Sequence, residues 1–309
     1  MSVVVRARPS VDAACADVAP RRARARSYLM CPPEHFEVAY AINPWMDPGV
    51  PVDRARAMRQ WHDLVDTHRG LGHRVDLLPA VPGLPDMVFT ANGALVVDGR
   101  AHVARFAHPE RRAEADHHLA WLRANLDPTA RQSFATSEAE GDLLVVGDLV
   151  LAGTGFRTDR ATHDEVEAMF GREVVTLELV DPSYYHLDVA LAVLDDATIA
   201  WYPPAFSVTS QALLAGRFPE ALEVTGADAA VLGCNVVGDG RHVVLDHRAE
   251  TLADDLADAG FVPVPVEVDE FTKAGGGVKC MTMELRPGIL PSSAEPTTTT
   301  DTTRPGGPA

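Results

Sequence analysis

The feature that most restricts how this chain can fold is a turn that recurs at a regular interval. Acidic or glycine turns between short apolar runs begin at Asp98, Gly147, Asp195 and Gly238, so they lie 43 to 49 residues apart. Turns of this composition between apolar runs are typical of tight β-hairpins. A hairpin that returns at such a period predicts one repeat architecture rather than a set of unrelated domains.

A helix and a short strand complete each repeat. Segments with helix-like patterns are 53–71, 109–126, 159–170, 210–222 and 248–259. Short β-type runs follow most of them, at 75–78, 174–177 and 262–264. The count reaches five if the strand near Cys280 forms a hairpin with region 28–42. Because one such unit cannot bury both of its faces alone, we predict an α/β fold, a five-bladed pseudo-symmetric α/β propeller.

The ends of the chain differ in composition from the repeats. We expect a loose leader at 1–27, including a basic cluster at 21–26, then a single catalytic propeller domain at 28–288. A disordered tail at 289–309 is expected because that stretch is poor in apolar residues. No apolar run approaches the roughly 20 residues of a membrane span, and no secretory segment precedes the repeats. These features predict a cytoplasmic protein.

Charge and metal-ligand spacing restrict the partners. The net charge of −17 argues against nucleic acid or an anionic membrane as a partner, and it suits a small cationic substrate. The four cysteines show no C-x-x-C spacing and the histidine pairs are not at i, i+4, so we expect no metal and no cofactor. The oligomeric state is left open.

Cys280 is the strongest candidate for chemistry. Three glycines, at 275–277, and Lys279 precede it. Glycines let a backbone approach a substrate closely, and a neighbouring cation favours the thiolate over the thiol. The competing interpretation is a cysteine buried in the core, which is common for this residue type.

Other polar candidates occupy one recurrent place in the repeat, the link before each hairpin. These residues are Asp86, Asn92, Glu138, His186 and Asn235. Equivalent links of a closed repeat converge on its axis. We therefore predict that the cysteine, the histidine and the carboxylates meet in one pocket.

Six motifs, read together, resemble the superfamily of guanidino-group modifying enzymes. They are Met30-Cys31-Pro32-Pro33, Ile42-Asn43-Pro44-Trp45-Met46, Phe89-Thr90-Ala91-Asn92, Glu138-Ala139-Glu140-Gly141-Asp142, His186-Leu187-Asp188 and Gly275-Gly276-Gly277-Val278-Lys279-Cys280-Met281-Thr282. The superfamily includes dimethylarginine dimethylaminohydrolases, arginine deiminases, arginine dihydrolases and amidinotransferases. Its five-bladed α/β propeller agrees with the repeat count.

The resemblance implies a role for each candidate. Cys280 would attack the guanidinium carbon and form a covalent thiouronium, and His186 would serve as general acid and base. Asp188 and one glutamate, Glu138 or Glu140, would hold the guanidinium nitrogens. Arg105 and Arg157 would bind the substrate carboxylate. Further substrate-binding candidates are Asn43, Asp86, Asn92 and Asn235.

The amides indicate the branch of the superfamily. Asn43 and Asn92 stand in motifs that resemble those of arginine dihydrolases. These enzymes hydrolyse the guanidino group twice and release ornithine, ammonia and carbon dioxide. An amide at 92 keeps a hydrogen-bonding group but removes a charge, so a neutral ureido intermediate can stay bound. Arginine dihydrolysis is therefore the preferred interpretation. The alternatives are dimethylarginine hydrolysis to citrulline and dimethylamine, then amidinotransfer, and finally a catalytically silent propeller that serves as a binding protein.

Overall fold

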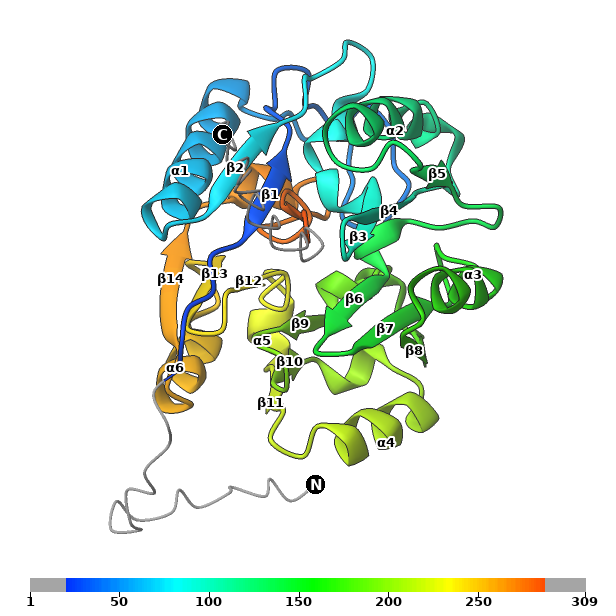
Figure 1. Cartoon of the computed structure of the whole chain (residues 1–309). Coiled ribbons are helices and arrows are strands. Elements are labelled where there is room, and N and C mark those ends of the chain that lie inside the picture. The colour runs from blue at the N-terminus through cyan, green and yellow to red at the C-terminus, as the bar shows by residue number, and fades with distance from the viewer. Residues whose placement is uncertain (1–20, 287–309) are drawn as a thin grey trace, which may run out of the picture.

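Five three-stranded sheets surround a common centre, and the longer helices lie on the outside (Figure 1). The structure, a computed structural model, describes residues 21–286. In sheet order, the strands are β15 (Met283–Glu284), β1 (Ser27–Met30) and β2 (Arg74–Leu77); β3 (Ala94–Val97), β4 (Arg100–Val103) and β5 (Arg131–Gln132); β6 (Leu143–Val146), β7 (Leu149–Thr154) and β8 (Glu173–Glu178); β9 (Leu191–Val193), β10 (Ile199–Trp201) and β11 (Leu222–Glu223); β12 (Val237–Gly238), β13 (His242–Asp246) and β14 (Val262–Val266).

Every sheet has the same topology. Its first two strands pair antiparallel, and its third strand pairs parallel to the second. A hairpin turn joins the antiparallel pair in four sheets, whereas β15 and β1 lie far apart in the sequence. A parallel neighbour requires a crossover, and a helix supplies it. These helices are α1 (Arg54–Gly70), α2 (Glu114–Asn125), α3 (Ala161–Phe170), α4 (Val208–Arg217) and α6 (Glu250–Asp258). The predicted five-bladed α/β propeller is confirmed, and its fifth blade closes where Tyr28 of β1 lies opposite Glu284 of β15, an antiparallel pair rather than the expected hairpin.

Local chemistry sets the boundaries of these elements. Asp98 and Gly99 both have positive φ, 51° and 76°, as a two-residue hairpin turn of type I′ requires. Asp53 caps α1 by accepting from the backbone N–H of Arg56. Helix α4 ends at Arg217 rather than at the expected 222, because Phe218 precedes Pro219 and is held out of helical geometry.

Two very short helices, α5 (Gly226–Ala229) and α7 (Asp269–Thr272), complete the regular elements together with short 3₁₀ turns. Four of these turns lie in the links before the hairpins: η1 (Pro85–Val88), η2 (Thr90–Asn92), η4 (Ala139–Gly141) and η6 (Leu187–Val189). Turn η4 contacts both η2 and η6. The links of successive blades therefore meet, as the repeat predicted.

The expected leader is only partly outside the fold. Arg21 stacks on the Phe261 ring at 3.5 Å, and Arg26 forms an ion pair of 2.8 Å with Glu284. Strand β1 begins at Ser27 because its backbone groups pair with both β2 and β15. The expectation of a loose segment is thus wrong for residues 21–27. The remainder of that call, 1–20, and the tail at 289–309 lie outside the described residues. Within 21–286, no helix is long and apolar enough to cross a membrane.

Candidate active site

Cys280 lies in the bend that leads into β15 and is buried, with 1% of its surface exposed. The Asn235 side chain holds it at two points. Its Oδ1 accepts from the Cys280 N–H at 3.1 Å, and its Nδ2 lies 3.2 Å from Sγ. The same Nδ2 donates to the Asp188 carbonyl at 3.0 Å. Asn235 thereby fixes the cysteine relative to the link that carries Asp188.

The cysteine thiol and Asp188 form a buried pair. Sγ lies 3.2 Å from Asp188 Oδ2. Burial raises the pKa of Asp188 to about 6, and burial together with the Asp188 carboxylate raises the pKa of Cys280 well above its usual value. The thiol therefore keeps its proton and donates a hydrogen bond to the Asp188 carboxylate. Asp188 Oδ1 has no hydrogen-bond partner.

Lys279 does not stabilise the thiolate, contrary to the expectation from sequence. Its Nζ bonds Glu140 Oε2 at 2.6 Å and the Thr282 carbonyl at 3.1 Å. The ammonium group is therefore paired with Glu140 and not with the sulfur of Cys280. The consecutive residues Lys279 and Cys280 thus contact different carboxylates, Glu140 and Asp188, which their adjacency in the sequence does not reveal.

Glu138, His186 and Arg157 form a second buried group. His186 Nε2 lies 2.8 Å from Glu138 Oε2, and Arg157 Nη1 lies 3.0 Å from the same oxygen. Burial alone would raise the pKa of Glu138, but Arg157 and the hydrogen bond with His186 outweigh it and hold that pKa well below its usual value. The carboxylate is therefore charged and orients the imidazole, whose Nδ1 has no partner. That free nitrogen is available for proton transfer.

Asp86 and Asn92 meet around a guanidinium group that the sequence reasoning missed. Arg111 forms a two-point ion pair with Glu114, donates to Asn92 Oδ1 at 2.8 Å and donates to the Asp86 carbonyl at 3.2 Å. Tyr40 donates to Asp86 Oδ2 at 3.0 Å. Burial raises the pKa of Asp86, and its Oδ1 remains without a partner.

Arg111 determines which way the Asn92 amide points. A guanidinium can only donate hydrogen bonds, so it takes the amide oxygen. The amide nitrogen is then left as a buried donor, and it has no partner. Gly141 keeps this space open, because a Cβ there would lie 2.5 Å from Asn92 Nδ2.

Several of these side chains, Cys280, Asp86, Asn92, Arg111 and Arg157, border a narrow cavity of about 10 Å³, roughly the volume that one water molecule needs. Glu138, His186, Asp188 and Asn235 lie beside this cavity but are not part of its wall. The wall residues are Ile42, Asn43, Met46, Asp86, Phe89, Asn92, Arg111, Arg157, Tyr185, Ala274, Gly276 and Cys280. Asn43 is tied down within this wall, since its Nδ2 donates to the Ala274 carbonyl and its Oδ1 accepts from the Trp45 N–H. Glycine is required at 276, where a Cβ would lie 2.3 Å from the Phe89 ring.

Two candidates lie elsewhere. Glu140 is fully buried but faces Lys279, Arg286 and the Glu284 N–H, so it is not a partner for a guanidinium in the cavity. Arg105 is exposed, and its Nε donates to the Ser133 carbonyl at 2.7 Å. Both candidates were predicted from their positions in the motifs. Both point away from the cavity because neighbouring side chains of a link or strand face different sides.

The site also contains residues that the sequence did not single out. Arg111 and Glu114 are three residues apart on the helical segment 109–126, where such a pair is normally a solvated contact. Tyr185 adjoins His186, donates to the Gly275 carbonyl at 2.9 Å and stacks under Arg157. Of these residues, only Tyr185 is marked in the sequence at all, by its position next to His186.

The cysteine, the histidine bonded to a glutamate and the free carboxylate oxygens, placed at the centre of five similar blades, define a class of protein. The chain is a member of the superfamily of guanidino-group modifying α/β propellers. A model of the family described as N,N dimethylarginine dimethylhydrolase, eukaryotic, matches residues 46–287. The chain belongs to this dimethylarginine dimethylaminohydrolase and arginine dihydrolase family.

Relatives with known names lie on both branches. The chain is 52% identical to the N(G),N(G)-dimethylarginine dimethylaminohydrolase of Mycobacterium tuberculosis, over 86% of this chain and 88% of that protein. It is 36% identical to the bifunctional arginine dihydrolase/ornithine cyclodeaminase ArgZ of Synechocystis, over 85% of this chain but only 38% of ArgZ.

Solved structures agree with this placement. A substrate-bound mutant of the ArgZ N-terminal domain, an arginine dihydrolase, superposes with a TM-score of 0.82 at 36% identity, covering 86% of this chain and 100% of that domain. A dimethylarginine dimethylaminohydrolase adduct with 4-chloro-2-hydroxymethylpyridine has a TM-score of 0.69 at 18% identity, which shows a shared fold.

Proposed function

We propose that this protein hydrolyses the guanidino group of arginine twice, as an arginine dihydrolase, with Cys280 as the nucleophile. The observation that carries the choice of arginine is the Asn92 amide, which offers a buried N–H donor at the cavity. A donor cannot bond the N–H groups of a guanidinium, but it can bond the oxygen of a ureido group. Such an oxygen is present in the product of a first hydrolysis.

The charged groups around the cavity suit a cationic amino acid. Asp86 and Asp188 each keep one carboxylate oxygen without a partner, and these oxygens can accept N–H bonds from the substrate. Arg111 and Arg157 both line the cavity and can bind a carboxylate. Arg111 therefore replaces Arg105 in the clamp that the resemblance implied. Asn43 and Asn235 position the surrounding backbone and Cys280 rather than the guanidinium.

The first round uses the buried thiol. A guanidinium placed beside Asp188 brings positive charge next to Sγ, which lowers the cost of ionising the thiol. The thiol passes its proton to His186 as sulfur forms a bond to the central guanidinium carbon. The bond from that carbon to a terminal nitrogen then breaks, and His186 gives the proton to that nitrogen so that ammonia leaves. His186 next removes a proton from water, the hydroxide attacks the thiouronium carbon, and the C–S bond breaks to release a ureido product.

The second round repeats the same steps on the ureido carbon. Attack by sulfur again expels ammonia, and hydrolysis of the resulting thiocarbamate yields a carbamate that decomposes to ornithine and carbon dioxide. Because the ureido group is neutral, carboxylates hold it weakly. The Asn92 N–H donor compensates by binding its oxygen, so the intermediate remains for the second attack.

Product analysis tests this proposal. The pure protein is incubated separately with arginine, citrulline and asymmetric dimethylarginine, and the products are identified by mass spectrometry, with Cys280→Ser as the inactive control. We expect ornithine and two equivalents of ammonia from arginine. Citrulline as the sole final product would contradict the second round. Inactivity on all guanidino compounds would favour the silent binding protein.

Dimethylarginine hydrolysis is the second candidate. It is favoured by the 52% identity to a protein named for that activity. The same steps would release dimethylamine in place of the first ammonia and stop at citrulline. Release of dimethylamine from dimethylarginine, with arginine left unchanged, would establish this alternative. Transfer of the amidino group from arginine to an added amine would instead indicate amidinotransfer.

A further inference from the structure

Asp142 is a buried carboxylate at the end of the link that also carries Glu138. It is 1% exposed and follows turn η4 directly. Its Oδ1 accepts from the Leu187 N–H at 3.0 Å, and Leu187 is the residue after His186. Its own N–H bonds the Ala139 carbonyl at 2.9 Å. Asp142 therefore connects the link of Glu138 with the link of His186.

The second oxygen of Asp142 is free to act on a neighbouring charge. Oδ2 is buried and has no hydrogen-bond partner, and the same is true of His186 Nδ1. Burial raises the pKa of Asp142, and positive charge on His186 is the strongest influence that lowers it. Such an interaction is reciprocal, so the Asp142 carboxylate stabilises positive charge on His186 to the same extent.

Two glycines let the imidazole and the carboxylate pack directly against the backbone. A Cβ at Gly141 would lie 3.2 Å from His186 Nδ1, and a Cβ at Gly153 would lie 2.8 Å from Asp142 Oδ1. The Gly153 N–H also bonds the Asp142 carbonyl at 2.7 Å. Any larger residue at 141 or 153 would displace one member of the pair.

The other carboxylate at the imidazole is already shared with a cation. Glu138 Oε2 lies 2.8 Å from His186 Nε2 and 3.0 Å from Arg157 Nη1. If His186 gains a second proton, two cations adjoin this one carboxylate. Negative charge from Asp142 offsets the charge that the imidazole gains.

The groups on the remaining sides of His186 have other partners or no charge. Asp188 also interacts with charge on His186, but its Oδ2 bonds the Cys280 thiol at 3.2 Å and its free oxygen accepts from the substrate in the proposed function. The Tyr185 ring lies 4.6 Å from the imidazole, measured between centroids. Burial raises the pKa of Tyr185 well above its usual value, so its hydroxyl is neutral.

We propose that Asp142 is a positioning residue that holds His186 in place and stabilises its imidazolium form. The inference rests on the proposed role of His186 as acid and base. When the Cys280 thiol passes its proton to His186, positive charge appears on a ring that is 1% exposed and so has little water to stabilise it. The Asp142 carboxylate stabilises that charge in place of water. Its bond to the Leu187 N–H keeps the ring in the same position through both rounds.

Asp142→Asn tests the charge, because an amide keeps an oxygen that can accept from the Leu187 N–H. We expect kcat on arginine to fall by about tenfold or more while KM stays within about threefold, because the imidazolium forms only during the reaction. The NMR signal of the His186 ring, identified by its loss in His186→Asn, should titrate at a pH lower by about 1 or more. The acid limb of the kcat profile should move in the same direction.

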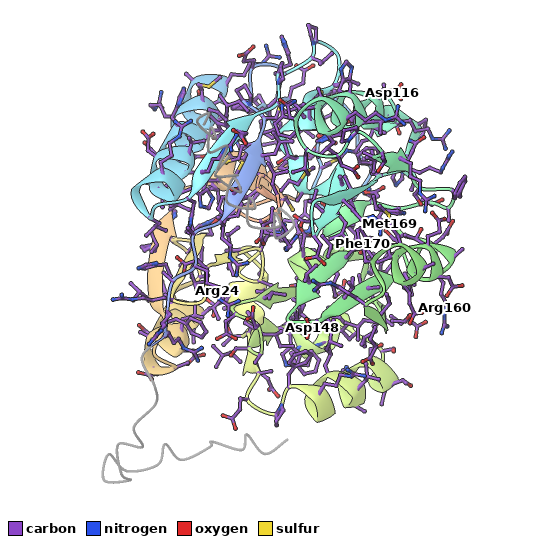
Figure 2. All side chains as sticks on the ribbon, viewed as in Figure 1. Arg24, Asp116, Asp148, Arg160, Met169 and Phe170 are labelled. Atoms are coloured by element: carbon purple, nitrogen blue, oxygen red, sulfur yellow. The ribbon has the colours of Figure 1, made fainter. Side chains whose placement is uncertain are left out.

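Asp148→Asn is the matched control. Asp148 is exposed in the turn between β6 and β7, at the opposite end of β6 from Asp142 (Figure 2). The substitution removes the same charge from the same blade. Neither kcat nor the titration of His186 should differ from the wild type.

A second titration keeps the test valid if Asp142→Asn does not fold. In His186→Asn the Asp142 carboxyl carbon, followed by NMR, should titrate at higher pH than in the wild type, because the positive charge that lowered its pKa is gone. An unchanged titration of His186 in folded Asp142→Asn would leave Asp142 a purely structural role and overturn the proposal, as would an unchanged titration of Asp142 in His186→Asn. Neither titration needs substrate. Shifted titrations in a protein that does not act on arginine would contradict the proposed function alone and still support the pairing of Asp142 with His186.

Discussion

Glu140→Gln separates a carboxylate that holds the fold together from one that binds substrate. In the structure Glu140 is completely buried and accepts from Lys279, Arg286 and the Glu284 N–H. An amide keeps the shape but removes the charge, which leaves the Lys279 ammonium without a carboxylate. Breaking a buried ion pair by changing one partner costs about 3–5 kcal/mol. A loss of that size corresponds to a fall in Tm of about 6–20 °C.

The assay combines urea unfolding, followed by tryptophan fluorescence, with steady-state kinetics on arginine. We expect Glu140→Gln to lose stability while KM stays within threefold, because its carboxylate does not reach the cavity. Glu37→Gln is the control for stability: it removes an exposed partner of Arg54, and such pairs are worth about 0–1 kcal/mol. Glu138→Gln is the control for activity, since it removes the group that orients His186, and its kcat should fall by about 10²–10⁴. A Glu140→Gln protein with an unchanged free energy of unfolding and a strongly raised KM would refute the reasoning.

Four further outcomes are expected. Cys280→Ser should lower kcat by at least about 10³ with an unchanged Tm, because a hydroxyl cannot supply the anion that attacks the guanidinium carbon; full activity would remove the mechanism. Asn92→Asp, read by mass spectrometry, should shift the products of arginine from ornithine toward citrulline, because a carboxylate next to the cavity grips the cation but repels the ureido oxygen; an unchanged ratio would contradict the role of the amide. The raised pKa of Asp188 means that the folded state holds a proton which the unfolded chain releases, so the unfolding free energy should fall by up to about 3 kcal/mol as pH rises from about 4 to 6, and Asp188→Asn should lack that loss in urea titrations at each pH. Dialysis against a chelator should leave activity intact, because the proposed steps use a thiol and an imidazole; loss that zinc restores would disprove this.

The repeat is the part of the structure that local sequence determines well. Asp98 and Gly99 both adopt positive φ because a two-residue hairpin turn requires it. A turn of this composition between two short apolar runs is a strong local signal for a β-hairpin. Once five such units exist, closing them into a ring buries the faces that each unit leaves exposed. The links must then meet, which is why the repeat by itself predicts that Asp86, His186 and Cys280 share one site.

Sequence could not determine which member of a link faces the cavity. Glu138 and Glu140 differ by two residues, yet one bonds His186 and the other bonds Lys279. Glu138 precedes the 3₁₀ turn η4 and Glu140 lies inside it, and side chains there follow neither the period of a strand nor that of an α-helix. Arg105 and Arg111 show the same limit. Arg111 lines the cavity and its guanidinium pairs with the buried carboxylate of Glu114, whereas Arg105 is exposed.

The properties of the proposed nucleophile Cys280 also depend partly on the sequence and partly on the folded structure. The glycines before Cys280 are required by contacts with Phe89 and Asn235, and their presence in the sequence already indicated a close approach. The proton on the thiol depends on burial and on Asp188, 92 positions away along the chain. Sequence thus determined the repeat and the residue types, whereas desolvation and long-range charge, which exist only in the folded chain, decided how those residues interact.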